Sequence, residues 1–206
     1  MLSRYSRSEM KSVWSEKRKY EIWLEIELAI LKARAEKGEI PVSASKKISK
    51  EAEIDLKRIK EIEEETRHDM IAFIEGISEN LGDESRFIHE GVTSSDIKDT
   101  ARAMQMGEAC QLILEDLENL KQTLGQKARE YKDTIMVGRT HGVHAEPITW
   151  GLKLLNWYQE IKRQITRLQE LEKMLAVGQI SGAVGTFATI DPEIEKRVCQ
   201  ILGLKN

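Results

Sequence analysis

Apolar residues recur along most of the chain at the three- and four-residue spacing that is typical of α-helices. Between residues 16 and 37 they form two stripes, one with Tyr20, Trp23, Leu24, Leu28, Leu31 and Ala35, the other with Ile22, Ile26, Ala29 and Ala33. Ser15 is a suitable N-cap, and Gly38 is placed to end the helix. Because a helix that is apolar on two sides must be covered on both, we expect it inside the fold.

Shorter helical patterns occur in the first half of the chain and near its end. A charged stretch near residues 53–65 carries Leu56, Ile59 and Ile62, and a second helix is expected over residues 69–81. Asp191 and Pro192 have the form of an N-cap followed by proline at the first helical position. This pair predicts one more short helix near the end of the sequence.

Two much longer patterns fill the second half. Residues 95–131 contain no proline and carry a near-heptad seam of Cys110, Ile113, Leu117, Leu120, Leu124 and Tyr131. A second seam follows Pro147, with steps of seven through Leu154, Ile161, Leu168 and Leu175. Such seams predict a bundle of long helices. Since two helices cannot enclose seams of this length, we expect further chain or partner subunits to cover them.

The composition agrees with an all-α fold. The 206 residues include 13 glycines and 3 prolines, fewer than the roughly 25 of ordinary usage, with 40% hydrophobic and 33% charged residues. We expect an N-terminal helical domain over residues 1–93. Residues 94–206 are expected to form the first part of a central long-helix bundle domain, incomplete because no third long helix follows.

Charge and cysteine usage exclude several classes. With 32 Lys+Arg against 35 Asp+Glu the net charge is −3, which gives no case for nucleic acid or a membrane surface as partner. No apolar run approaches the roughly 20 residues that span a bilayer, and the first residues lack a secretory signal. Cys110 and Cys199 stand alone and are expected to be buried thiols in a reducing compartment. The cytoplasm is therefore the expected location.

All four histidines lie at junctions between predicted helices. His68 and His89 precede helices, while His141 and His144 lie in GRTHGVHAEP, which we expect to be a loop. A single histidine is most often a surface or packing residue, but this placement favours acid–base chemistry for His68 and His141. For His144 both interpretations stay open. A zinc site is disfavoured, because no cysteine lies near and Glu146-Pro147 breaks the local helix.

A hydroxyl-rich segment, Gly91–Asp96, precedes the first long helix. Ser94 or Ser95 could cap that helix, or the amides and hydroxyls could hold a carboxylate or phosphate. Arg4, Arg67 and Arg139 could neutralise an anionic substrate, although each alone is more simply a surface charge. The glycine-rich segment 178–185 lacks the features of a phosphate-binding loop and suggests close backbone approach to a ligand or neighbour.

Four segments together resemble the adenylosuccinate lyase family of the fumarase/aspartase superfamily: RYS (4–6), TRHDMIAF (66–73), HEGVTSSDI (89–97) and GRTHGVHAEPITWG (138–151). The resemblance implies a β-elimination that releases fumarate from adenylosuccinate, giving AMP, and from SAICAR, giving AICAR, in purine nucleotide biosynthesis. It implies no metal and no organic cofactor. It also implies a homotetramer in which several subunits build each active site.

The resemblance also assigns roles to residues. His141 would exchange a proton with the leaving nitrogen, and His68 would assist or orient it. Thr93 and Ser94 would bind the succinyl carboxylates. Other substrate-binding residues would be Arg67, Asp69 and Thr140 along the site, Arg4 and Tyr5 at the nucleotide end, and His89 facing the substrate or its phosphate.

One signature of the superfamily does not occur in the sequence. It is a mobile loop of the type GSSxMPxKxN, which supplies the serine believed to act as the base. We therefore expect the chain to be a catalytically incomplete N-terminal portion of such an enzyme. Two alternatives remain open: another lyase of the superfamily, such as argininosuccinate lyase, or a cycloisomerase; and a non-catalytic helical assembly or regulatory module.

Overall fold

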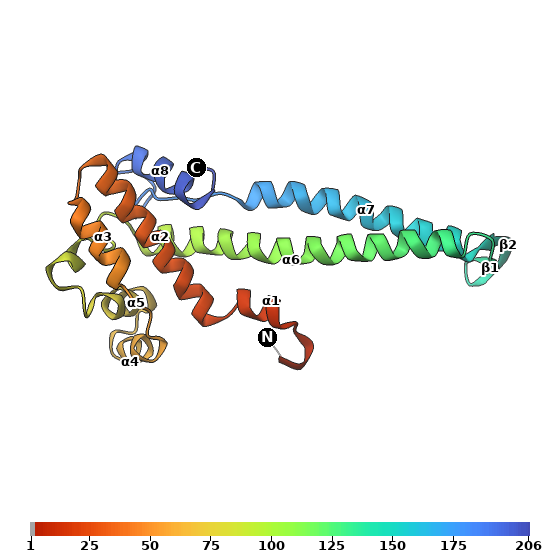
Figure 1. The fold of residues 1–206 in the computed structure, drawn as a ribbon, viewed down its shortest axis with the longest axis horizontal. Helices are drawn as coiled ribbons and strands as arrows, with labels where there is room; N and C mark the ends of the chain where they lie inside the picture. The colour runs from red at the N-terminus through yellow and green to blue at the C-terminus, as the bar shows by residue number, and fades with distance from the viewer. Residues whose placement is uncertain (1–2) are drawn as a thin grey trace. The chain divides into compact units, whose positions relative to one another are not determined.

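The computed structural model describes residues 3–206, which fold mostly into helices (Figure 1). The chain divides into two compact units. The first unit holds the residues up to 107 together with 175–206, and the second unit holds 108–174. The mostly helical class that the sequence predicts is confirmed. The domain boundary expected between residues 93 and 94 stays a prediction.

Helix α2 (Glu16–Lys37) is the centre of the first unit. Its N-cap is Ser15, whose side chain accepts the N–H of Arg18 at 3.1 Å, and it ends at Gly38 in the left-handed conformation, so both predicted ends are confirmed. Buried residues face both sides of the helix, as the two stripes predict: Tyr20, Ile22, Trp23, Ile26, Glu27, Ala29, Ile30, Leu31, Ala33 and Ala35. The one charged residue among them is Glu27.

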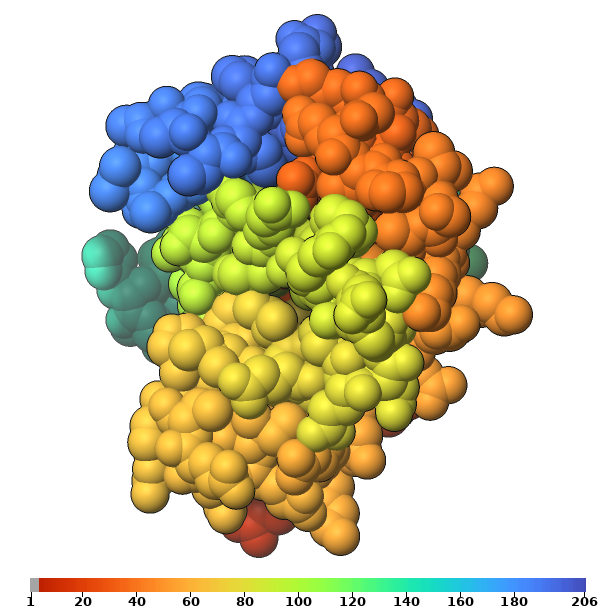
Figure 2. Space-filling view, turned by 90° about the vertical axis from the view of Figure 1, so that its left-hand side faces the viewer, coloured from red at the N-terminus to blue at the C-terminus, as the bar shows by residue number. Residues whose placement is uncertain are grey.

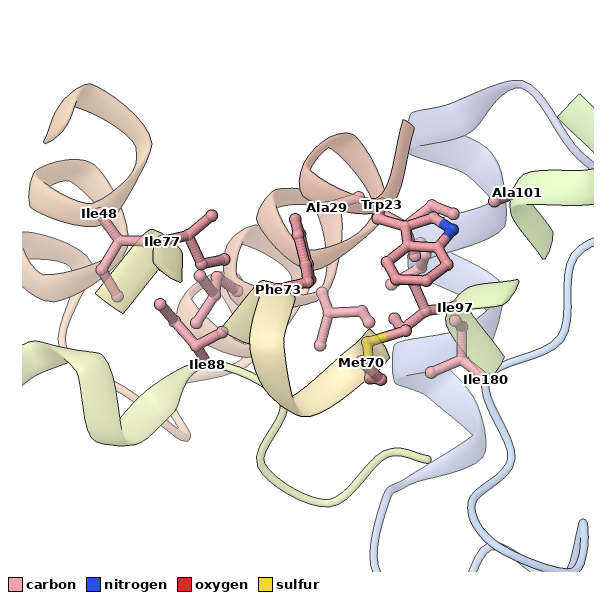
Figure 3. Close-up of a cluster of buried hydrophobic side chains, with 14 of the residues drawn as sticks. Trp23, Ala29, Ile48, Met70, Phe73, Ile77, Ile88, Ile97, Ala101 and Ile180 are labelled. Carbon is pink, nitrogen blue, oxygen red and sulfur yellow. The ribbon is translucent and has the colours of Figure 1, made fainter. Parts of the chain in front are cut away.

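The other helices of the first unit pack around α2. They are α1 (Ser8–Val13), α3 (Val42–Glu51), α4 (Leu56–Thr66), α5 (Asp69–Ser78) and α8 (Pro192–Leu202), with the 3-10 helices η1 (Ser3–Tyr5) and η2 (Gly82–Phe87). The core between them includes Trp23, Phe73, Ile97 and Ile180 (Figure 3). Trp23 and Phe73 meet edge to face at 5.4 Å between ring centroids, which adds to the apolar burial.

Two helix boundaries differ from the prediction. Helix α4 begins at Leu56 rather than near residue 53, because the Asp55 carboxylate accepts the first N–H groups of the helix. Helix α5 ends at Ser78, and the N–H of Leu81 then donates to the Ser78 carbonyl in a tighter turn. Leu81 is nevertheless fully buried, so it belongs to the core although it lies outside the helix.

The second unit is built on two long helices. Helix α6 (Ser94–Glu130) contributes its residues from 108 onward, and α7 (Trp150–Leu175) runs antiparallel beside them (Figure 1). Leu124, Ala128 and Leu154 form the buried contact. Ile113 and Leu120 of the first predicted seam remain exposed, and so do the apolar residues Trp157, Leu171 and Met174 of α7. The expectation that other chains cover these seams stays a prediction.

A β-hairpin joins the two long helices, so the loop expected there is wrong. Strand β1 (Ile135–Thr140) pairs antiparallel with β2 (Val143–Thr149), and Thr140 faces Val143 across a two-residue turn. The turn residues His141 and Gly142 both have positive φ, 50° and 76°. This is the geometry of a type I′ hairpin, which usually carries Asn-Gly. Because His-Gly stands where Asn-Gly is usual, the sequence pattern did not predict a hairpin here.

Both cysteines are buried thiols, as predicted. Burial raises the pKa of the Cys199 thiol to about 11. Within residues 3–206 no helix combines the length and the apolar character needed to cross a membrane.

Candidate functional site

Three segments of the first unit that are far apart in sequence are joined by side-chain contacts. They are residues 66–69, 89–98 and 178–190, which we call the site segments. In Figure 2 the chain around residues 82–100 (yellow-green) lies between the part with α4 and α5 (yellow-orange) and the C-terminal part (blue). The contacts between the site segments include those of two carboxylates, Asp69 and Asp96.

Asp96 fixes the hydroxyl-rich segment. Helix α6 begins at Ser94, so Thr93, rather than Ser94 or Ser95, takes the N-cap position. The Thr93 N–H donates to Asp96 Oδ2 at 2.9 Å, and the Asp96 N–H donates to the Thr93 carbonyl, a reciprocal arrangement related to a capping box. Asp96 is 1% exposed and also accepts the N–H groups of Ser181 and Gly182, each at 3.0 Å. This carboxylate thus ties two site segments together.

The Thr93 and Ser94 side chains are half-buried beside this contact. Among the described residues, neither hydroxyl has a hydrogen-bond partner. The positive end of a long helix and two available hydroxyls suit an anionic group, such as a carboxylate.

His89 is held by a residue that the sequence did not single out. Its Nδ1 lies 2.6 Å from Glu27 Oε1, and its backbone N–H donates to Glu27 Oε2 at 3.1 Å. Glu27 is 1% exposed, and His89 has a φ of 60°. The one available sign was a carboxylate among apolar residues on a core helix, which marks a buried charge that needs a partner.

His68 has a structural role in addition to any chemical one. It is the N-cap of α5, and its Nδ1 accepts the N–H of Ile71 at 3.3 Å. The residue before it, Arg67, ends α4 in the left-handed conformation with a φ of 55°. Both side chains are exposed, so they can contact a ligand.

The Asp69 carboxylate is already paired. Lys98 Nζ lies 2.7 Å from Asp69 Oδ1, which also accepts the N–H of Met70 at 2.8 Å. Partial burial opposes ionisation of Asp69, but the hydrogen bond and charge of Lys98 hold its pKa below the ordinary value. Asp69 is therefore an anchor between α5 and α6, and Lys98 is its partner, which the sequence did not indicate.

The remaining predicted residues lie elsewhere. Thr140 and His141 are exposed on the hairpin of the second unit, with His144 on strand β2. Arg4 and Tyr5 are exposed on η1, where the guanidinium lies 4.7 Å from the Tyr5 ring centroid. The structure thus brings together candidates from the site segments, while Thr140 and His141 belong to the other unit. No cluster of three or more potential metal ligands occurs within residues 3–206.

Comparison with known proteins identifies relatives over the whole chain. The profile of a lyase family matches residues 3–206. An adenylosuccinate lyase of Staphylococcus saprophyticus is 49% identical over 99% of this chain and 47% of its own length. Those of Streptococcus mutans and Bacillus subtilis are 50% and 47% identical over 100% of this chain and 48% of their lengths. The chain therefore spans about half the length of these relatives.

Solved structures share the fold. A fumarate lyase from Mesorhizobium sp. BNC1 superposes with a TM-score of 0.91 at 29% identity, over 98% of this chain and 50% of that one. A 3-carboxy-cis,cis-muconate lactonizing enzyme from Pseudomonas putida gives 0.89 at 29% identity, over 98% and 48%. The fold is thus that of about half of a fumarate lyase-like chain.

Proposed function

Because the chain belongs to this lyase family, we propose that it forms part of a C–N lyase that releases fumarate from adenylosuccinate and from SAICAR. The products would be AMP and AICAR. The observation that carries the proposal is an identity of 47–50% to three adenylosuccinate lyases along the whole chain. The likeness to the lactonizing enzyme, at 29% identity, is less specific.

The chemistry requires two things of the protein. A proton leaves the carbon next to a carboxylate, and the carbanion-like intermediate needs electrostatic stabilisation. The C–N bond then breaks, its electron pair goes to the nitrogen, and that nitrogen takes up a proton from a general acid. In our proposal the exposed imidazole of His141 is this acid. The N-terminal end of α6, with the Thr93 and Ser94 hydroxyls, binds the succinyl carboxylate.

His68 would assist His141 through its other ring nitrogen, since its Nδ1 accepts the N–H of Ile71. Arg67, Arg4, Tyr5 and Thr140 are exposed and would contact the substrate, and His89 would face it or its phosphate. Asp69 would contribute indirectly through its ion pair with Lys98.

We further propose that these 206 residues do not turn over substrate by themselves. No serine-bearing GSSxMPxKxN loop occurs among them, so the base of the reaction must come from other residues. We also propose a homotetramer in which partner subunits cover the seams of α6 and α7. The exposed apolar residues Ile113, Leu120, Trp157, Leu171 and Met174 support this, because contiguous apolar seams are normally buried against another helix.

A chimera tests the proposed activity. Residues 1–206 are joined to the second half of the Bacillus subtilis relative, and fumarate release from adenylosuccinate is followed by absorbance. We expect turnover by the chimera, none by the 206-residue chain, and a loss of kcat of about 100-fold or more in the His141→Ala chimera.

The rival functions give different results. Argininosuccinate is offered side by side, and preferential turnover of it would replace our substrate assignment by that of another superfamily lyase. A folded chimera that self-associates but neither binds nor converts adenylosuccinate would favour a non-catalytic helical assembly.

A further inference from the structure

The ring of His89 contacts the buried carboxylate of Glu27, which lies 62 residues earlier in the chain. Glu27 uses both of its oxygens: Oε1 lies 2.6 Å from His89 Nδ1, and Oε2 accepts the His89 N–H at 3.1 Å. The Glu27 side chain is 1% exposed and that of His89 is 17% exposed. Two short contacts to one residue, away from solvent, fix both its backbone and its ring.

Neighbouring contacts hold the same turn. Arg34 lies seven residues after Glu27, two turns along α2 and on the same face, and its Nη1 lies 2.9 Å from Glu90 Oε2. The Thr189 hydroxyl donates to the Gly91 carbonyl at 2.7 Å. Residues 89, 90 and 91 are therefore each held from outside the turn. Such support is what allows His89 to keep a positive φ of 60°.

The hydrogen-bonding groups determine where the ring proton lies. With Glu27 ionised, its carboxylate only accepts hydrogen bonds, so Nδ1 of His89, which lies 2.6 Å from Oε1, carries a proton. In the neutral ring this leaves Nε2 unprotonated. Among the described residues Nε2 has no hydrogen-bond partner. The ring therefore accepts a hydrogen bond at Nε2 when neutral and donates one there, to an anion such as phosphate, when protonated.

We propose that Glu27 is a positioning residue, which fixes His89 in the Nδ1–H tautomer and presents Nε2 to the ligand. The identity of that ligand, the phosphate-bearing end of a purine nucleotide, rests on the proposed function. The tautomer and orientation of the ring rest on the contacts of Glu27 alone.

Glu27→Gln separates this role from a packing role, because glutamine has the same shape but one acceptor and one donor. The backbone N–H of His89 can only donate, so the amide oxygen must face it and the amide NH₂ must face Nδ1. Nδ1 then has to accept, and the proton moves to Nε2. In ¹⁵N-histidine-labelled chain, at a pH where the ring is neutral, we expect ring nitrogen shifts to report Nδ1–H in the parent and Nε2–H in Glu27→Gln.

Two controls accompany this measurement. Glu25→Gln removes an exposed carboxylate from the same helix and should leave the His89 tautomer unchanged. The exposed His144 serves as a reporter whose signals should be the same in all three proteins. An Nε2–H tautomer in the parent, or an unchanged Nδ1–H tautomer in a folded Glu27→Gln chain, would overturn the proposal.

A titration with AMP tests whether the ring faces the ligand. In the chimera with the second half of the Bacillus subtilis relative, we expect Glu27→Gln to bind AMP about tenfold more weakly than the parent chimera, with Glu25→Gln unchanged. A tautomer switch without any change in AMP affinity would overturn the presentation of Nε2 to the nucleotide. Failure of the parent chimera to bind AMP would count against the proposed function, while the ring nitrogen shifts would still decide the role of Glu27.

Discussion

The carboxylate of Asp96 accepts the backbone N–H of Ser181 at 3.0 Å, across 85 residues of sequence. The other oxygen of the same carboxylate accepts the N–H groups of Thr93 and Gly182. One buried side chain therefore completes the hydrogen bonding of a helix N-terminus and of a glycine-rich segment at the same time. The Thr189 hydroxyl also joins the two segments, through the Gly91 carbonyl, but Asp96 is the one buried carboxylate among the described residues that contacts both.

Replacing this carboxylate should be strongly destabilising. In Asp96→Asn one of the two oxygens becomes an NH₂ group, which faces an N–H donor instead of accepting from it. We expect a loss of about 3 kcal/mol in the free energy of unfolding, measured by urea denaturation. Asp99→Asn, an exposed change on the same helix, should stay within about 0.5 kcal/mol. Equal effects of the two substitutions would contradict the role of Asp96.

The ion pair between Asp69 and Lys98 should make stability depend on pH in the acid range. The pKa of Asp69 lies below its ordinary value of 3.8 in the folded chain, so the stabilisation is complete above that value. It is lost as the pH falls through the lower, folded value. We expect Lys98→Met to lose about 0.5–1 kcal/mol at neutral pH, since the pair is one-third exposed, with the difference from the parent shrinking in acid.

The control for this experiment is the same comparison in an Asp69→Asn background. There Lys98→Met should show no acid-dependent difference, because no carboxylate remains to titrate. Urea midpoints across the acid range measure both pairs, and a difference that stays constant with pH would exclude the ion pair as its cause.

His68 should show separable effects on stability and on activity. His68→Ala removes the N-cap of α5 and should cost about 1 kcal/mol, read from the thermal or urea transition. Asparagine is among the best N-caps, so His68→Asn should lie within about 0.5 kcal/mol of the parent. In the chimera both variants should lose turnover. Full turnover of the His68→Asn chimera would show that His68 serves only as a cap.

Two glycines on the long helices should respond to alanine with opposite signs. A Cβ at Gly151 would overlap the Ala128 carbonyl oxygen and lie 2.7 Å from Lys132 Cα, so Gly151→Ala should lose about 1–3 kcal/mol. A Cβ at Gly107 meets nothing within 4 Å on helix α6, so Gly107→Ala should gain up to about 1 kcal/mol. The two unfolding transitions, compared with the parent, test the close approach of α6 and α7.

The helices could be predicted where local chemistry decides their ends. Ser15, Gly38 and the Asp191-Pro192 pair act within one turn of the chain, and the structure uses each as expected. The hairpin could not be predicted, because His141 occupies a turn position that normally carries asparagine or glycine. The early end of α5 could not be predicted either, because Leu81 is buried and continues the apolar spacing of the helix although it is not helical.

For the candidate site, motifs in the sequence indicated the residues that would meet a ligand but not the ones that hold them. Glu27 and Asp96 are buried acids whose partners lie 62 and 85 residues away. Lys98 similarly meets Asp69 only after α5 and α6 have packed. No spacing rule along a single chain reports such contacts, because they arise when separate elements meet.

Four non-glycine residues among the described ones have positive φ, and three of them are Arg67, His89 and His141. Glycine or asparagine at position 67 or 141, where the side chain is exposed, would relieve about 1 kcal/mol of backbone strain, whereas replacing His89 would also remove the ring partner of the buried Glu27 carboxylate. Selection for heat resistance alone is therefore expected to replace Arg67 and His141. The proposed function predicts the opposite when turnover is required: laboratory selection for turnover should retain Arg67 and His141, and selection for stability alone should replace them.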